Sequence, residues 1–221
     1  MSNFAITRQK MVDGQLRTSD VTDRRILDAM LSLPREIFVP EDRRALAYLD
    51  LDLDIGPTGS KRFLIKPMTT ARLLQAAEIK PTDKVLIAGC ATGYMAALAV
   101  RLAAEVVATE SDSALAARGN DILPKLDFQE TVTIRTAETA AGWPAEAPFN
   151  VIVLNGATEI TPEGLYQQLA ESGRLVGVFA SERPSRAVLV TRSHGDFGHR
   201  TLFDVAAPIL PGLERRAEFV F

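Results

Sequence analysis

The residues best suited to chemistry in this sequence form a short glycine-containing segment and an acidic residue that follows it. The segment Gly89-Cys90-Ala91-Thr92-Gly93-Tyr94 comes directly after the apolar run 84–88, and Glu110 ends the next apolar run. Small residues at positions 89, 91 and 93 let backbone N–H groups approach a ligand where a helix begins. A carboxylate at the end of the next strand can accept hydrogen bonds from ribose hydroxyls. The pattern predicts a site for a nucleoside-containing cofactor.

Alternative interpretations of the segment stay open. A nicotinamide site would need glycine at position 94 for close packing of helix on strand, and Tyr94 is bulky, so NAD is disfavoured. A strand-to-helix turn without any ligand would also use these glycines, with Glu110 as a solvated carboxylate. Cys90 is expected to be a small packing residue rather than a nucleophile, because no histidine lies close in sequence to activate its thiol.

An alternation of strands and helices must position these residues. Strands are expected over 84–88, 105–109, 132–135, 150–154 and 174–179, and helices over 94–103, 112–124 and 162–171. Such alternation predicts an α/β fold with a doubly wound, mostly parallel, Rossmann-like sheet. Two further strands, 186–192 and 199–206, are expected to form an antiparallel hairpin across Gly195 to Gly198, which completes a seven-stranded sheet.

The first 80 residues are predicted to be a helical extension packed on the core formed by residues 81–221, with one structural domain overall. Helices are expected over 4–17, from the capping residues Asp20 to Asp23 through about Leu33, over a short stretch after Pro40, and from Pro67 to about Ala77. Residues 56–60 are expected to form a loop, because they are rich in glycine and proline.

Composition narrows the classes of function. The chain has 221 residues, a net charge of −3 and 47% hydrophobic residues, which is ordinary globular composition without the basic surplus of a nucleic-acid binder. One cysteine and two histidines make neither a disulfide nor a convincing metal site. No signal peptide or membrane span is evident, so the expected location is the cytoplasm, without a membrane partner.

Several segments carry a family likeness, and some of them have no role in cofactor binding. They are MVDGQLRTSDVTDRRILDAM, LPREIFVPEDRRALAYLD, VLIAGCATGYMAALAVRLA, GWPAEAPFNVIVLNGA and LYQQLAESGRLV. On these segments the chain resembles the protein-L-isoaspartate O-methyltransferases, for which PREIFVP and the pairing of GWP with APFN are distinctive. The resemblance implies a sheet that binds S-adenosyl-L-methionine (SAM), with an antiparallel last strand. It also implies methyl transfer to the free α-carboxylate of an isoaspartyl residue in a damaged protein.

The resemblance also implies a set of cofactor contacts. They are Gly89, Cys90, Ala91, Gly93, Glu110, Ala137, Glu138 and Asn155. Within this set the loop would line the methionine and ribose, Glu110 would hold the ribose, and Ala137 and Glu138 would flank the adenine. Asn155 would face the same crevice at the end of its strand, although capping of a turn is an equal alternative for it.

The family's catalytic hydroxyl is missing from this chain. Family members usually have I-S-Q-P before the third helix, with the serine thought to engage the substrate carboxylate, whereas this chain has Leu64-Ile65-Lys66-Pro67. The expected hydroxyl is therefore replaced by Ile65. Nearby hydroxyls that could substitute for it belong to Thr58, Ser60, Thr69 and Thr70. Thr58 and Ser60, in the preceding loop, are the candidates for the catalytic role.

The cofactor loop departs from the family at two further positions. Ile87 replaces an acidic residue, and Ala91 replaces a glycine at a cost on the order of 1 kcal/mol if the backbone there is left-handed. Both changes favour weaker binding of SAM. Three hypotheses follow: an isoaspartyl carboxyl methyltransferase acting as a monomer or weak homodimer; a SAM-binding relative that is a regulatory module or methylates another acceptor; and a different nucleotide-binding α/β enzyme such as a dehydrogenase.

Overall fold

A seven-stranded sheet lies at the centre of the computed structural model, which describes residues 3–57, 60–126 and 132–215. The strands are β3 (Lys84–Ala88), β4 (Glu105–Glu110), β5 (Ile134–Thr136), β6 (Phe149–Thr158), β7 (Leu169–Phe179), β8 (Arg186–Ser193) and β9 (Asp196–Asp204). Their order in the sheet is β5-β4-β3-β6-β7-β8-β9. The first five in this order are parallel, and β8 and β9 pair antiparallel. The predicted α/β class and antiparallel C-terminal hairpin are confirmed.

The central strand β3 is buried on both faces. Val85 and Ile87 belong to the larger hydrophobic core, and Leu86 and Ala88 belong to a second core on the opposite face. This alternation follows from the two-residue period of a strand, and it explains why the sequence there is a continuous apolar run.

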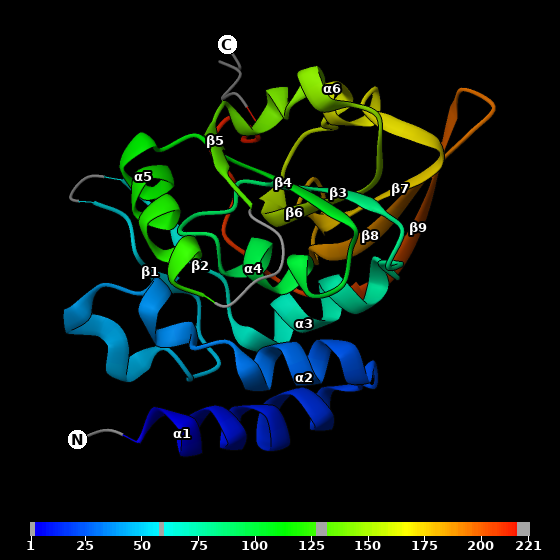
Figure 1. Cartoon of the computed structure of the whole chain (residues 1–221). Helices are drawn as coiled ribbons and strands as arrows, with labels where there is room; N and C mark the ends of the chain where they lie inside the picture. The colour runs from blue at the N-terminus through cyan, green and yellow to red at the C-terminus, as the bar shows by residue number, and fades with distance from the viewer. Residues whose placement is uncertain (1–2, 58–59, 127–131, 216–221) are drawn as a thin grey trace, which may run out of the picture.

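Helices from the N-terminal part form layers against one face of the sheet (Figure 1). In Figure 1, α1 and α2 lie outermost, with α3 and α4 between them and the sheet, and α6 lies beyond the opposite face. The helices are α1 (Phe4–Met11), α2 (Arg24–Ser32), α3 (Pro67–Ala76), α4 (Tyr94–Val100), α5 (Ser113–Ile122) and α6 (Glu163–Tyr166). The larger core takes side chains both from these N-terminal helices and from the sheet.

Local sequence explains the ends of these helices. Helix α1 continues into a π-helical stretch, Val12–Leu16. The two together span most of the helix expected over 4–17. Helix α2 begins after Asp23, whose side chain accepts a hydrogen bond from the backbone N–H of Arg25, as an N-cap does. Short 3₁₀ helices follow at Arg35–Phe38 and Glu41–Leu46.

A small hairpin stands apart from the main sheet. Its strands are β1 (Leu53–Asp54) and β2 (Phe63–Leu64), which pair antiparallel with each other as a separate two-stranded sheet. The backbone N–H groups of Ile55 and Gly56 both donate to the carbonyl of Arg62, so that the backbone of Arg62 is fixed at the base of this hairpin. The expected loop at 56–60 thus lies between two short strands.

The helix expected over 162–171 is wrong for most of its length. Helix α6 ends at Tyr166, and β7 begins at Leu169, which pairs with Phe149. The register then shifts, and Ser172 has the left-handed φ of +61°. The helical period of this segment was misleading because its residues are divided between a short helix and an irregular strand that contains a bulge.

The C-terminal turn is tighter than expected. The sequence predicts a hairpin across Gly195 to Gly198, whereas β8 and β9 are joined by two residues, His194 and Gly195, with Ser193 paired to Asp196. Both turn residues have positive φ, of +52° and +88°, which matches the right-handed twist of the strands.

No helix within 3–57, 60–126 or 132–215 has the length and apolar character needed to cross a bilayer. The same residues contain no group of three or more histidine, cysteine or acidic side chains placed to hold a metal ion.

Candidate active site

The loop that follows β3 has the backbone shape of a ligand-binding turn. Gly89, Ala91 and Gly93 have φ values of +70°, +55° and +93°. Gly93 is the N-cap of α4, so the loop ends where a helix begins, at the carboxyl ends of the parallel strands. The left-handed conformation considered for position 91 is confirmed, and alanine there costs on the order of 1 kcal/mol relative to glycine.

Phe38, from the segment PREIFVP, holds this loop in place. The hydroxyl of Thr92 donates to the Phe38 carbonyl at 2.7 Å, and both residues are buried. The ring of Phe38 packs edge-on against Tyr94, with 5.3 Å between the ring centroids. Burial raises the pKa of Tyr94 to about 12. Tyr94 is therefore a packing residue at the start of α4, which explains the bulky side chain where a dinucleotide motif has glycine.

Glu110, at the end of β4, lies beside the loop as the sequence predicts. Its Oε2 accepts a hydrogen bond of 2.6 Å from the backbone N–H of Ala91, and its Oε1 accepts one of 3.0 Å from the N–H of Asp112. The side chain of Glu110 is fully buried. A buried carboxylate needs hydrogen bonds and a counter-ion, and here it has both.

The counter-ion of Glu110 is Arg62, which sequence analysis did not identify. Nε of Arg62 donates to Oε1 of Glu110 at 3.0 Å, and Nη2 donates to Oε2. Nη2 also donates to the carbonyl of Gly89 at 3.0 Å. The Arg62 side chain is 3% exposed. Its only signal in the sequence is a basic residue between a glycine-containing loop and an apolar pair, which does not distinguish it from surface charge.

Asn155 reaches the same loop from β6. Its Nδ2 donates to the Gly89 carbonyl at 2.9 Å, so that carbonyl accepts from both Arg62 and Asn155. On its Cα side, Gly89 is covered by Leu210, because a Cβ at position 89 would lie 2.7 Å from Cδ2 of Leu210. Asn155 therefore supports the loop as well as lying beside it.

Residues 137 to 139 border the loop from the end of β5. The backbone N–H of Ala137 donates to the Glu110 carbonyl at 3.0 Å, and Glu138 is exposed. The hydroxyl of Thr139 is buried and has no hydrogen-bond partner among the described residues. A Cβ built at position 89 would lie 3.5 Å from Cγ2 of Thr139, so Thr139 lies directly beside Gly89.

The thiol of Cys90 is unsuited to nucleophilic chemistry. Cys90 is fully buried, and burial raises the pKa of its thiol well above the ordinary value, with the charge of Glu110 acting in the same direction. A thiol held in its neutral form is a poor nucleophile, so its burial agrees with a packing role.

The candidate catalytic positions differ in their environments. Ile65 is 1% exposed and belongs to the larger core, and its carbonyl accepts a 2.7 Å hydrogen bond from Nη2 of the buried Arg35. Ser60 is partly exposed in the turn before β2, and its N–H donates to the Pro57 carbonyl. Thr58 lies outside the described residues. Ile65 therefore fills the core.

Two threonines of α3 were further candidates for the missing hydroxyl. Thr70 donates its hydroxyl to the carbonyl of Lys66 at 3.2 Å, so its hydrogen bond is made within the helix. The hydroxyl of Thr69 is buried and unpartnered among the described residues.

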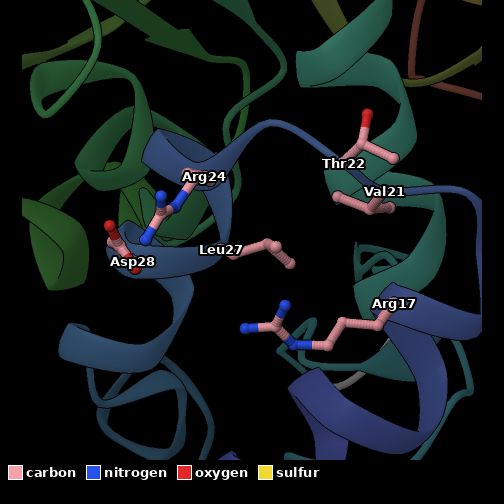
Figure 2. Close-up of a pocket in the computed structure, with 6 residues that line it drawn as sticks. All are labelled: Arg17, Val21, Thr22, Arg24, Leu27 and Asp28. Carbon is pink, nitrogen blue, oxygen red and sulfur yellow. The ribbon is translucent and has the colours of Figure 1, made fainter.

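A pocket of about 490 Å³ lies among the N-terminal helices, and none of the residues discussed above lines it (Figure 2). In Figure 2 the side chain of Arg17 extends across the opening toward Leu27. Arg17 also pairs with Asp13 at 3.2 Å, and both side chains are about half exposed. This pocket is thus a surface hollow between helices.

Comparisons with known proteins agree with the geometry. A family model described as Protein-L-isoaspartate(D-aspartate) O-methyltransferase matches residues 6–206. The protein-L-isoaspartate O-methyltransferase 1 of Syntrophobacter fumaroxidans is 36% identical over 202 residues, covering 91% of this chain and 92% of the relative.

Two solved structures have the same fold. One protein-L-isoaspartate O-methyltransferase superposes with a TM-score of 0.82 at 23% identity, covering 94% of this chain and 67% of the other. A Plasmodium falciparum protein assigned to the same activity, solved with S-adenosyl-L-homocysteine, gives a TM-score of 0.74 at 19% identity, covering 95% and 99%.

Proposed function

This chain belongs to the protein-L-isoaspartate O-methyltransferase family, and we propose that it transfers the methyl group of SAM to the α-carboxylate of isoaspartyl residues in proteins. The family uses SAM and acts on isoaspartyl-containing proteins. The observation that carries the proposal for this chain is the buried carboxylate of Glu110, which lies beside a left-handed glycine loop at the carboxyl ends of β3 and β4.

The residues around this loop suit an adenosyl group. Glu110 offers a carboxylate for ribose hydroxyls, and Ala137 and Glu138 border the place for the adenine. The unpartnered hydroxyl of Thr139, next to Gly89, is a buried polar group that a ligand could satisfy. Gly93, Cys90 and Asn155 complete the proposed set by shaping and supporting the loop.

The chemistry asks little acid–base work of the chain. Bound SAM supplies an electrophilic sulfonium methyl group, and a carboxylate with an ordinary pKa is already ionised at neutral pH. The chain's own residues therefore orient the reactants and exclude water, which is worth roughly 7 to 11 kcal/mol of the barrier in well-aligned reactions. The complete burial of the loop 89–93 is consistent with such a water-poor site.

The substrate carboxylate needs a donor that Ile65 cannot provide. We assign this role to the hydroxyl of Ser60, with that of Thr58 as the second candidate. Ser60 lies in the turn between β1 and β2, three residues before Phe63, with which β2 begins, and it is partly exposed. A hydroxyl on a turn can reach an incoming peptide, whereas the side chain of residue 65 is enclosed in the core.

Several broader properties belong to the same proposal. We expect a cytoplasmic protein that acts as a monomer or weak homodimer, and we expect neither nucleic acid nor membrane among its partners. Residues 1–80 would serve as a helical extension of a single domain. The net charge of −3 supports the expectation about nucleic acid.

Methyl transfer to synthetic peptides tests the function. With SAM, a peptide containing isoaspartate should gain a base-labile methyl ester, while the same peptide with ordinary aspartate should not. Thr139→Val should raise KM for SAM with little change in thermal stability, because its hydroxyl has no hydrogen-bond partner among the described residues, and Thr139→Ser should behave as the parent chain does. Equal labelling of both peptides, or none, would contradict the proposal.

A further inference from the structure

We propose that Arg62 is a built-in competitor for the ribose of the cofactor, so that nucleoside binding requires the guanidinium to leave Glu110. The inference rests on the proposed function, because it concerns the same carboxylate. It adds to that function a residue that sets the affinity of the site and that belongs to the β1–β2 hairpin rather than to the cofactor loop.

The capacity of Glu110 to accept hydrogen bonds is already used in full. A carboxylate has about four lone-pair positions on its two oxygens. Donors to these oxygens are Nε and Nη2 of Arg62, the backbone N–H groups of Ala91 and Asp112, and the hydroxyl of Ser111. Ribose hydroxyls can therefore bind Glu110 only if an existing donor leaves.

Arg62 is the donor that can leave. The N–H groups of Ala91 and Asp112 belong to the backbone beside the strands β3 and β4. The Ser111 hydroxyl makes the longest of the five contacts, at 3.3 Å, and its loss would still leave four donors for about four lone-pair positions. The Arg62 side chain, in contrast, reaches Glu110 from a separate two-stranded hairpin. Its backbone carbonyl is held by Ile55 and Gly56, so rotation of the side chain can break the ion pair without unfolding the hairpin.

Release of Arg62 carries a cost that lowers affinity for the cofactor. The pair is bidentate and both side chains are at most 3% exposed, which is the setting in which separating an ion pair is most unfavourable. A ligand must offset this cost with its own contacts. Its apparent affinity is therefore its intrinsic affinity multiplied by the fraction of molecules in which Glu110 is free of Arg62.

Calorimetric titration of the full chain with S-adenosyl-L-homocysteine tests the proposal. Arg62→Gln should bind at least about 10-fold more tightly than the parent chain, which corresponds to about 1.4 kcal/mol. Arg62→Lys should show a smaller gain, because an ammonium group cannot bridge both carboxylate oxygens. With 2′,3′-dideoxyadenosine, which lacks the competing hydroxyls, neither variant should gain.

Arg174→Gln is the matched control. Arg174 makes a second largely buried ion pair, with Asp83 at 2.8 Å, but Asp83 precedes β3 and so lies at the opposite end of the strand from the loop. This variant should lose thermal stability without any gain in affinity. A similar gain in Arg174→Gln would show that general loosening, rather than competition at Glu110, improves binding, and would overturn the proposal.

The outcomes separate this inference from the proposed function. Parent-like or weaker binding by both Arg62 variants would overturn the competition and leave the methyltransferase assignment intact. If Arg62→Gln does not fold, the Arg62→Lys titration decides by the same criterion. Binding by a variant with none by the parent at millimolar ligand would support competition but count against SAM-dependent activity of the parent. Absence of binding in all of them would overturn both.

Discussion

The hydroxyl of Thr92 donates a 2.7 Å hydrogen bond to the carbonyl of Phe38, which lies 54 residues earlier in the chain. This contact joins the loop 89–93 to the N-terminal helical part of the chain. It is reinforced by the edge-on packing of Phe38 against Tyr94, two residues after Thr92. The segment around Phe38 thus helps to hold the shape of the loop 89–93.

Thr92→Val should destabilise the protein by about 1 to 3 kcal/mol, because it removes the donor and leaves the buried Phe38 carbonyl unsatisfied. Urea denaturation measures the change. Thr92→Ser keeps the hydroxyl and should lose much less. A loss in Thr92→Ser as large as that in Thr92→Val would mean that the hydrogen bond contributes no more than the packing of the methyl group.

Ala91→Gly should stabilise the protein by about 1 kcal/mol, since the φ of +55° at this position is unfavourable for any residue with a Cβ. Thermal unfolding followed by circular dichroism is a suitable measurement. Gly93→Ala is the opposite change and should destabilise, because φ is +93° there and the new Cβ would lie 3.0 Å from Cδ1 of Ile134. Stabilities that do not move in opposite directions would refute this explanation.

Ile65→Ser should cost about 2 to 5 kcal/mol of stability, because the isoleucine side chain is 1% exposed. The smaller serine would leave a cavity in the core and would bury its own hydroxyl there. Ile65→Val should cost only about 0.5 to 1.5 kcal/mol. Denaturant titration distinguishes the two. Methyl transfer per folded molecule should be no faster in the serine variant than in the parent chain. A clear increase would show that residue 65 takes part in the reaction.

Asp23 should contribute to stability in a pH-dependent way. Its hydrogen bond to the side chain of Arg25 lowers the pKa of the Asp23 carboxyl from the ordinary value of 3.8. The folded state therefore binds the proton more weakly than the unfolded state. The contribution is fully present above pH 3.8 and is lost as pH falls through the lowered folded pKa.

Asp23→Ala is the variant that measures this contribution. It should cost about 1 kcal/mol near neutral pH, as the loss of an N-cap does, and the difference from the parent chain should shrink below pH 3.8. Melting temperatures at pH 7 and pH 3 provide the comparison. A difference that is as large at pH 3 as at pH 7 would rule out a role for the carboxylate charge.

Local pattern was sufficient for most of the sheet and failed at particular places. The run 84–88 indicates a strand buried on both faces, because a short apolar segment that ends at a glycine turn is typical of a central parallel strand. The prediction of a helix over 162–171 failed because the segment from Leu169 onward belongs to β7, whose register with β6 shifts. The irregular pairing with β6 decides that conformation, and pairing is not a local property.

The sequence alone determined most strands and helices of the α/β fold, the glycine loop, the position of Glu110 at a strand end and the family, since each depends on periodicity or on short motifs. Only the tertiary structure decided what those residues contact. Arg62 lies 48 residues from Glu110, and whether a charged side chain is buried or solvated depends on which carboxylate the fold brings within reach of it. The same holds for Ile65, whose enclosure in the core requires side chains from both the extension and the sheet.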